Sequence, residues 1–541
     1  MEKTRRTAVR NLLLYDTTLR DGAQTEGIAF SADDKVRIAH KLDALGLHYV
    51  EGGFSAPSNH TDMEFFAHMR ERPLPHAKLV AFGMTCRANS SPEDDPGVRN
   101  LVSLGVPVAA VVGKAWDLHV TDVLRTTLAE NLRIVQDTIR FVKAHGLEAG
   151  FDAEHFFDGW KHHPSYAREC LQAAAEAGAD WVCLCDTNGG ALPEEVREVV
   201  KQVRKAVKIP VGIHAHNDCE LAVANSLAGV QAGAAMVQGT VNGYAERCGM
   251  ANLCSLLPNL QLKLGIKCVT EEQLSMLYDV AHYVASLANM PPPEREAYVG
   301  RSAFAHKGGM HLDAMLKNQR TYEHVRPETV GNERRHLISD QAGRGAVLHK
   351  VQALNLGLGK DSPQAKEIMA RLKSMGHAGY QFEGAEASFE LMVRKSVGLY
   401  EPRFALQGFR VIIERVGEGE IRTEATLKLK VDGVSEHTAA DGDGPVHALD
   451  SALRKALTRF YPQIADIKLT DFKVRVVNGA DEGTAASVRV MVESRAGSKT
   501  WTTVGVHTNI IEASWQALVD GVEYGLLELL NAEEDQPPPT A

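Results

Sequence analysis

The sequence predicts an α/β protein: a (β/α)₈ barrel, then a helical linker region, then a C-terminal α+β domain with an internal repeat. Three observations predict this order. Short apolar runs alternate with amphipathic stretches up to about residue 264, the pattern is mainly helical up to about residue 402, and strand-like alternation follows. A chain of 541 residues is also too long for one ordinary domain. The predicted boundaries are 11–264, 265–402, 403–531 and a disordered tail at 532–541.

The barrel is predicted from eight β-rich runs. They read "LLLYDTT", "YVEGGF", "KLVAFGM", "VAAVVGK", "AGFDAEH", "WVCLCDT", "VGIHAHND" and "MVQGTVNG". Amphipathic stretches such as 31–46, 128–146 and 166–180 lie between them and end near a glycine, as helices often do. Apolar strands that alternate with helices indicate a parallel sheet buried on both faces. Eight units in this length are typical of a (β/α)₈ barrel.

The linker region is predicted to be helical. The stretch "TEEQLSMLYDVAHYVASLANM" reads as a helix that stops at the prolines 291–293. The segment "RSAFAHKGGMHLDAML" follows, and further helices are expected from about residue 362. This region is expected to contribute to the active site.

The C-terminal domain shows an internal repeat. The segments 444–453 and 509–518 share residues at matching positions, and each follows a strand-like stretch and begins a helix. "RTEATLKLKVDG" and "ASVRVMVESR" are two of these strand-like stretches. Two such halves form a pseudo-symmetric module, for which we expect either dimerisation or a regulatory ligand site between repeats or subunits.

Bulk properties exclude some classes of partner. The chain has 59 basic and 69 acidic residues, a net charge of −10, which argues against nucleic acid or an anionic membrane as the main partner. No apolar run is long enough to cross a bilayer, and the basic N-terminal stretch has too short an apolar run for a signal peptide. The eight cysteines lack a framework spacing. We therefore expect a cytoplasmic protein, with Cys183 and Cys185 as buried strand residues.

Polar residues gather at the predicted carboxyl ends of the strands, where barrel enzymes place their chemistry. They are Asp16, Arg20, Asp21, Glu51, Asp152, Glu154, His155, Asp186, Thr187, Asn188, His214, His216, Asn217, Asp218 and Asn242. His214 and His216 are two residues apart on one strand, so that their side chains point to the same side. A carboxylate with two imidazoles is a common set of ligands for a catalytic divalent metal. We predict that Asp21, His214 and His216 bind a metal, the alternative being two hydrogen-bonded core histidines.

Three further residues have candidate roles. Arg20 lies beside Asp21 and could donate to a carboxylate or carbonyl oxygen, or form a surface ion pair instead. Thr187 could hydrogen-bond a substrate carboxylate or act as a cap at the end of its strand. Glu154 could transfer protons or hold a water, or pair with a basic residue at the rim.

At "LYDTTLRDGAQ", "CDTNGG", "HAHND" and "NGYAERCGM" the sequence resembles the DRE-TIM metallolyases, specifically their Claisen-condensing members. These are the isopropylmalate, homocitrate and citramalate synthases. The resemblance covers nearly the whole chain, including "AFAHKGGMH" and the repeated C-terminal domain. The stretches "DAEHFFDGWK", "GNERR" and "HTAADGDGPVHALDSAL" are most similar to the long citramalate synthases.

The resemblance implies a metal-dependent acyltransferase that condenses acetyl-CoA with a 2-oxo acid and hydrolyses the thioester. For the citramalate synthases the acceptor is pyruvate and the product leads towards isoleucine. It implies that Asp21, His214 and His216 bind Mn²⁺, Mg²⁺ or Zn²⁺, that Arg20 stabilises the enolate or keto oxygen, and that Thr187 holds the substrate carboxylate.

The same resemblance assigns proton transfer to Glu154 and His311, with Tyr322 as a weaker candidate. It also implies a homodimer that is inhibited by a branched-chain amino acid. Among these amino acids we expect isoleucine to be the inhibitor. An isopropylmalate or homocitrate synthase would differ only in the lining of the pocket, and a carbon–carbon lyase on the same barrel is disfavoured by the C-terminal domain.

One departure from the family pattern concerns the metal. The pattern after the eighth strand is G-E-R-x-G-N, whose asparagine supplies another metal oxygen, whereas this chain has Ala245 and Met250 at the outer positions. A thioether is a poor substitute for an amide oxygen on Mg²⁺ or Mn²⁺. Three readings stay open: a metal held by three protein ligands, weaker binding, or a catalytically weakened homologue that acts as a ligand-binding protein. Met250 could also be simple packing.

Overall fold

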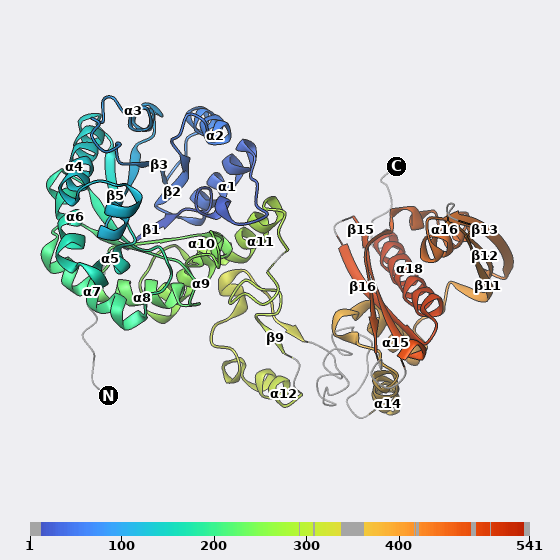
Figure 1. Cartoon of the computed structure of the whole chain (residues 1–541). Helices are drawn as coiled ribbons and strands as arrows, with labels where there is room; N and C mark the ends of the chain where they lie inside the picture. Colours follow the sequence, from blue (N-terminus) through green and yellow to red (C-terminus); the bar gives the residue numbers. More distant parts are fainter. Residues whose placement is uncertain are drawn as a thin grey trace, which may run out of the picture. The chain divides into compact units, whose positions relative to one another are not determined.

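Figure 1 shows the computed structural model of the chain. The structure describes residues 12–291, 293–306, 309–336, 362–415, 417, 421–477, 483–497 and 499–534. The chain forms two compact units. One comprises the residues up to Phe304 together with His324–Arg334, and the other comprises Ala305–Glu323 and the residues from Arg335 onward. Among the described residues, no helix has the length and apolar character needed to span a membrane.

The first unit is a closed barrel of eight parallel strands that pair in sequence order, as predicted. The strands are β1 (Leu13–Asp16), β2 (Tyr49–Phe54), β3 (Lys78–Met84), β4 (Val108–Lys114), β5 (Glu148–Glu154), β6 (Trp181–Asp186), β7 (Val211–Ala215) and β8 (Met236–Gly239). β8 pairs with β1, with Tyr15 opposite Gln238, and this pairing closes the barrel. Closure brings the carboxyl ends of all eight strands to one rim.

Helices surround the barrel (Figure 1). They are α1 (Ala32–Leu45), α2 (His60–Glu71), α3 (Pro96–Ser103), α4 (Leu128–Ala144), α5 (Phe156–His162), α6 (Pro164–Glu176), α7 (Pro193–Ala206) and α8 (Ala222–Ala232). α1 shows why the sequence forms them: Ser31 and Asp34 make a reciprocal capping box, and Gly46 ends the helix at a φ of 92°. The unit continues past residue 264 with α9 (Leu253–Pro258), α10 (Glu271–Ser275) and α11 (Leu277–Leu287). The single helix predicted at 270–290 is therefore divided at Met276.

The barrel interior is apolar at one end and polar at the other. Side chains that alternate along the strands put Tyr15, Trp181 and Met236 into an interior cluster, whereas their neighbours face the helices. Gly150 makes room for the indole of Trp181, because a Cβ there would lie 1.9 Å from the ring. Further along the strands, the interior positions of β2, β5, β7 and β8 carry the polar side chains Glu51, Asp152, His214 and Gln238, whereas those of β3 and β4 stay apolar.

The second unit begins with a short parallel pair, β9 (Ala305–His306) and β10 (Arg335–His336). Its helices are α12 (Gly309–Lys317), α14 (Pro363–His377) and α15 (Glu386–Ser396). Ile368 of α14 and Phe389 of α15 share a hydrophobic core with Val504 of the C-terminal sheet. The helices before residue 402 thus pack on the elements that follow it.

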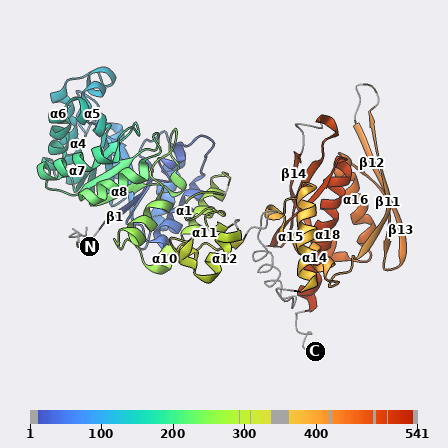
Figure 2. The same cartoon turned by 90° about the horizontal axis from the view of Figure 1, so that it is seen from below.

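The internal repeat is confirmed, because the C-terminal part contains two copies of three antiparallel strands and a helix. The first copy is β11 (Phe404–Arg415), β12 (Ile421–Val431), β13 (Val434–Gly442) and α16 (Pro445–Leu457). The second is β14 (Lys468–Val476), β15 (Val488–Ala496), β16 (Lys499–His507) and α18 (Ile510–Glu534). Figure 2 shows α16 and α18 between the two sheets, and both contribute to one core. The tail predicted at 532–541 begins too early, because α18 continues to Glu534. Residues 535–541 lie outside the described residues.

Candidate active site

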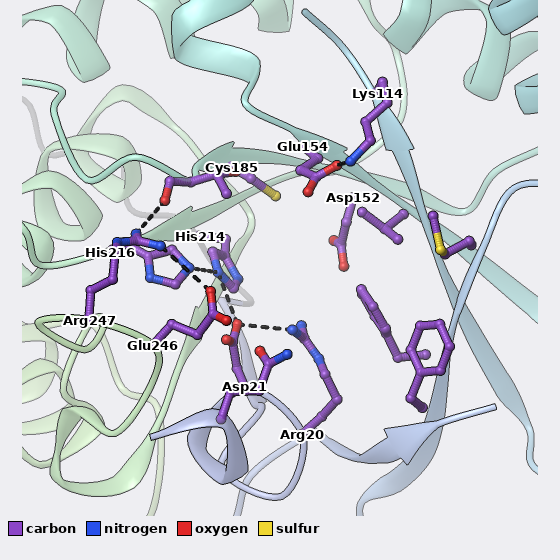
Figure 3. Close-up of a pocket in the computed structure, with 16 residues that line it drawn as sticks. Arg20, Asp21, Lys114, Asp152, Glu154, Cys185, His214, His216, Glu246 and Arg247 are labelled. Carbon is purple, nitrogen blue, oxygen red and sulfur yellow. Dashed lines mark hydrogen bonds and ion pairs between the residues drawn. The ribbon is translucent and has the colours of Figure 1, made fainter. Parts of the chain in front are cut away.

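Three predicted metal ligands converge at the polar end of the barrel (Figure 3). His214 and His216 lie at the end of β7, and Asp21 lies in the loop after β1. One ligand atom from each side chain lies within 4.8 Å of the others. The Nε2 atom of His214 is 3.4 Å from Asp21 Oδ2 and 3.4 Å from His216 Nε2. All three residues are buried.

The chemistry of these groups fits a divalent cation. Burial lowers the pKa of His214, and burial followed by His214 lowers the pKa of His216 to about 4, so both imidazoles are neutral at pH 7. Burial alone would raise the pKa of Asp21, but Arg20 and the histidines lower it overall. Two neutral imidazoles and a carboxylate therefore face one point. Nδ1 of His216 is also buried and has no hydrogen-bond partner among the described residues.

Arg20 is held beside this point by buried partners. Its Nη1 lies 3.1 Å from Asp21 Oδ2, its Nε lies 2.5 Å from Glu51 Oε1, and its guanidinium stacks on the Phe82 ring at 3.9 Å. Glu51 is fully buried and also accepts hydrogen bonds from the hydroxyls of Tyr15 and Thr17. The alternative of a surface ion pair for Arg20 is wrong, because both partners lie inside the barrel mouth.

The candidate residues line a cavity of about 260 Å³. One side of it is polar, and the other is formed by Phe54, Phe82, Met84 and Val112. Six of the residues predicted to bind metal or substrate or to transfer protons line this cavity, and Asp152 lies among them. Burial raises the pKa of Asp152 to about 7. The full lining is Arg20, Asp21, Gln24, Phe54, Phe82, Met84, Val112, Lys114, Asp152, Glu154, Cys185, Thr187, His214, His216, Glu246 and Arg247.

Thr187 and Glu154 have protein partners in this cavity. The Thr187 hydroxyl accepts a hydrogen bond of 2.9 Å from the His155 backbone N–H, which leaves its own proton for an acceptor in the cavity. Glu154 forms an ion pair with Lys114. Pairing with a basic residue at the rim was the alternative considered for Glu154 from the sequence. This ion pair is compatible with a role in proton transfer, which stays a prediction.

His311 belongs to the second unit. It lies exposed on α12, and its ring stacks on that of Tyr322 with 4.2 Å between the ring centroids. The two candidates that the resemblance named in the linker region are thus neighbours. Their part in catalysis stays a prediction.

Several residues of the predicted rim have other tasks. Asp16 accepts hydrogen bonds from the amide and hydroxyl of Thr18, and Asp186 accepts from the amides that precede α7. Asn242 turns outward and donates to the Ala281 carbonyl. These three residues, to which the sequence reading assigned no role, hold their own loops, because each loop after a strand needs its backbone groups satisfied. Cys183 and Cys185 are buried, as predicted.

Lys114, Arg247 and Gln238 were missed by the sequence reading. Lys114 ends β4, and Arg247 forms an ion pair with Asp218 at the rim, with 2.7 Å between Nε and Oδ1. Gln238 lies inside β8 and contacts His214. A lysine at a strand end, the arginine of "AERCGM" and a glutamine in the apolar run "MVQG" were the available signals.

Met250 and Asn252 occupy the stretch that departs from the family pattern. The backbone of Met250 forms an antiparallel bridge with His216, and its side chain is buried. The Asn252 side chain accepts from the Cys254 amide at 2.9 Å and so caps α9, and its amide lies 3.3 Å from Glu296. Asn252 is engaged in this cap rather than directed at the three ligands.

Comparison with known proteins places the chain in a family. The HMGL-like family model matches residues 11–284. The (R)-citramalate synthase of Aquifex aeolicus is 50% identical over 517 residues, which cover 95% of this chain and 98% of that protein. The (R)-citramalate synthases of Geobacter sulfurreducens and Synechocystis are 50% and 49% identical to this chain. Each alignment covers 95% of this chain, and they cover 97% and 96% of those two proteins. The chain belongs to the HMGL-like family, among the (R)-citramalate synthases.

Two further family models match the rest of this HMGL-like chain. The homocitrate synthase post-HMGL domain-like model matches residues 298–379, and the LeuA allosteric (dimerisation) domain matches residues 383–526. The second match covers α15 and both copies of the repeat. The resemblance drawn from the motifs is thus confirmed over all three regions of the chain.

Proposed function

We propose that the chain is an acyltransferase that condenses acetyl-CoA with pyruvate and hydrolyses the thioester to give citramalate and CoA. Citramalate formation is a step on the route towards isoleucine. One combination of observations carries the proposal: 50% identity to (R)-citramalate synthases over 95% of the chain, and a buried carboxylate with two neutral imidazoles in the barrel mouth. A cytoplasmic location belongs to the same proposal.

Asp21, His214 and His216 would hold the divalent metal, Mn²⁺, Mg²⁺ or Zn²⁺. When bound, this metal supplies Lewis-acid polarisation of the carbonyl of a 2-oxo acid. The carboxylate and the two neutral Nε2 atoms are ligand types that all three metals accept. The buried position of the three groups keeps competing water away from their acceptor atoms.

Arg20 and Thr187 would bind and orient the 2-oxo acid. Glu51 and Asp21 hold the Arg20 guanidinium on two sides, so the cation is oriented before substrate arrives. Its charge stabilises the negative charge that develops on the keto oxygen or on the enolate. The Thr187 hydroxyl, whose lone pair is already occupied by the His155 amide, donates its proton to the substrate carboxylate.

Glu154 and His311 would transfer protons. A proton must leave the methyl group of acetyl-CoA, and another must reach the alkoxide formed from the keto oxygen. Glu154 lines the cavity beside Lys114 and offers a carboxylate oxygen to the first of these tasks. His311, with Tyr322 stacked on it, is the second proton-transfer group of the proposal.

The lining of the cavity suits a 2-oxo acid as the acceptor. The rings of Phe54 and Phe82, with Met84 and Val112, form its apolar side opposite the polar groups. This apolar side would face the aliphatic part of the acid, which is a methyl group in pyruvate. The identity to (R)-citramalate synthases, rather than the size of the cavity, supports pyruvate.

Release of free CoA from acetyl-CoA tests the function against a panel of 2-oxo acids. We expect turnover with pyruvate, loss of it after treatment with a chelator, and recovery when Mn²⁺ is added. Preference for 2-oxoisovalerate would make the chain an isopropylmalate synthase, and preference for 2-oxoglutarate a homocitrate synthase. Silence with every acceptor, with metal present, would favour the weakened ligand-binding homologue that Met250 suggested.

The C-terminal part would dimerise the enzyme and bind a branched-chain amino acid, for which we propose isoleucine as the end product. The match to the LeuA allosteric (dimerisation) domain and the two copies of sheet and helix support this part of the proposal. Inhibition of CoA release by isoleucine, with leucine and valine as comparisons, tests the effector.

A further inference from the structure

Gln238 connects opposite sides of the barrel interior. It lies on β8, its side chain is fully buried, and it points inward at the level of Tyr15 on β1. Its Oε1 is 2.8 Å from His214 Nδ1 on β7, and its Nε2 is 3.1 Å from Asp152 Oδ1 on β5. The amide therefore bridges a predicted metal ligand and a buried carboxyl group. Gln238 is not among the residues that line the cavity.

The carboxyl group of Asp152 sets the direction of both hydrogen bonds. When Asp152 is ionised, both of its carboxylate oxygens can only accept, and Oδ1 accepts from Gln238 Nε2. The atom of Gln238 that faces Asp152 must then be the Nε2 donor, and the atom that faces His214 is the Oε1 acceptor. An acceptor at 2.8 Å requires the proton of His214 to be on Nδ1.

This tautomer leaves the lone pair of His214 on Nε2. That atom is the one 3.4 Å from Asp21 Oδ2 and 3.4 Å from His216 Nε2. Histidine ligands commonly need such a partner on the second nitrogen, which fixes the ring and raises its basicity. Without the acceptor at Nδ1, His214 could carry its proton on Nε2 and donate it to Asp21. Nε2 would then have no lone pair for a metal.

We propose that Gln238, oriented by Asp152, is a positioning residue that holds His214 in its Nδ1-protonated tautomer and so prepares the metal site before metal arrives. The inference rests on the proposed metal site but not on the identity of the 2-oxo acid. It assigns a role to a residue that touches neither the substrate cavity nor the metal position. Glutamine suits the task because a single amide presents one donor and one acceptor in opposite directions.

The first test measures Mn²⁺ affinity of the full-length, metal-free protein by isothermal titration calorimetry. Gln238→Met keeps the volume but removes both hydrogen bonds, and we expect binding about 10- to 100-fold weaker, the range found for lost partners of metal ligands. Asp152→Leu should weaken binding in the same direction. Asp152→Asn keeps an acceptor for Gln238 Nε2 and should stay within about 3-fold of the unmodified protein.

Thr138→Val is the matched control, because it removes another buried hydrogen bond, from the Cys86 amide, on the outer side of the barrel wall. It should leave Mn²⁺ affinity unchanged. Equal affinity of Gln238→Met and the unmodified protein would overturn the inference, as would an Asp152→Asn variant that binds as poorly as Asp152→Leu. An unmodified protein that binds no Mn²⁺ would instead overturn the proposed function.

A second measurement does not depend on metal binding, and it reads the tautomer in the unmodified protein. Long-range ¹H–¹⁵N correlation spectra of the metal-free protein with ¹⁵N-labelled histidine report the tautomer of each ring, and His214→Gln identifies the His214 signal. We expect the pattern of a ring protonated at Nδ1. A ring protonated at Nε2 would contradict the inference directly.

Discussion

Charge at the barrel mouth is divided between a carboxylate that has a counter-charge and two imidazoles that carry no charge. Arg20 is the one guanidinium within ion-pair distance of Asp21 in the described structure, and Glu51 draws it to one side. His214 and His216 remain neutral because burial disfavours their charged forms. At the scale of single residues, Arg20 offsets the charge of Asp21, whereas the two neutral imidazoles keep lone pairs that a divalent metal would accept.

Met250→Asn tests the departure from the family pattern. Met250 is 2% exposed, so an amide placed there without partners should lower the free energy of unfolding of the metal-free protein by about 1–3 kcal/mol. If its oxygen reaches the cation, Mn²⁺ should bind more tightly and restore that stability. Thermal unfolding with and without Mn²⁺ measures both effects. Met250→Leu is the control of similar size. If Mn²⁺ stabilises Met250→Leu as much as it stabilises Met250→Asn, position 250 does not contribute a ligand.

Asp152 should make stability depend on pH. Burial raises its pKa from 3.8 to about 7, so the folded state binds this proton more tightly than the unfolded state. Its contribution to stability is therefore present at low pH and is lost as the pH rises towards 7 and above. At about 1.4 kcal/mol per pKa unit, the loss amounts to roughly 4 kcal/mol at most.

The Asp152→Asn variant cannot ionise at this position and should gain stability over the unmodified protein at pH 8 but much less at pH 4.5. Urea denaturation at the two pH values measures the difference. The exposed replacement Asp33→Asn controls for the loss of one negative charge. An equal gain at both pH values would contradict the prediction.

At the scale of elements, a buried polar contact joins α15 to α18. Lys395 Nζ lies 3.3 Å from Asp520 Oδ1 and 3.7 Å from Glu523 Oε2. Ser388 donates to Asp520, and Tyr400 donates to Glu523. Burial raises the pKa of both carboxyl groups, and Lys395 opposes that rise. This contact fixes the linker helix on the C-terminal repeat through charges rather than through apolar packing alone.

Lys395→Met should destabilise the second unit by about 1–3 kcal/mol, because it leaves the buried Glu523 and the half-buried Asp520 without their cation. The effect should shrink at acidic pH, where both groups are protonated, and in the double variant with Glu523→Gln. Thermal unfolding at pH 5 and pH 8 provides the measurement. Lys366→Met on the exposed face of α14 serves as the matched control. A pH-independent loss equal to that of the control would show that the contact is not a stabilising ion pair.

At the scale of the whole molecule, the prediction concerns assembly and control. The match to a dimerisation domain supports a homodimer, so light scattering should give a mass near twice 58.9 kDa. Isoleucine should inhibit CoA release by the full-length enzyme and raise its unfolding temperature, because a bound effector stabilises the folded state. A monomer at micromolar concentration, or inhibition by leucine rather than isoleucine, would contradict these assignments.

Deletion of residues after 403 would be a poor test of the effector. α14 and α15 share their apolar core with β16, and Lys395 pairs with α18. Removal of the C-terminal part would expose this surface, so that loss of inhibition could reflect unfolding of the linker helices. Inhibition by isoleucine is therefore better tested with point variants of the full-length chain.

The sequence by itself determined the barrel, the repeat and the grouping of Asp21, His214 and His216. Each depends on short-range regularities: apolar strands that alternate with capped helices, two matching strand-and-helix segments, and H-x-H at a strand end with its two side chains on one face. Asp21 could be added because parallel strands in a closed barrel present their ends at one rim. The family motifs then supplied the chemistry expected of these groups.

Only the tertiary structure decided which polar side chains act together. Arg20 and Glu51 are 31 residues apart, His214 and Gln238 are 24 apart, and Gln238 and Asp152 are 86 apart. No local pattern links such pairs, because the first two meet only when β1 pairs with β2 and β7 with β8, and the third meets only across the interior of the closed barrel. For the same reason Asp16, Asp186 and Asn242 looked like site residues in the sequence but serve their own loops in the structure.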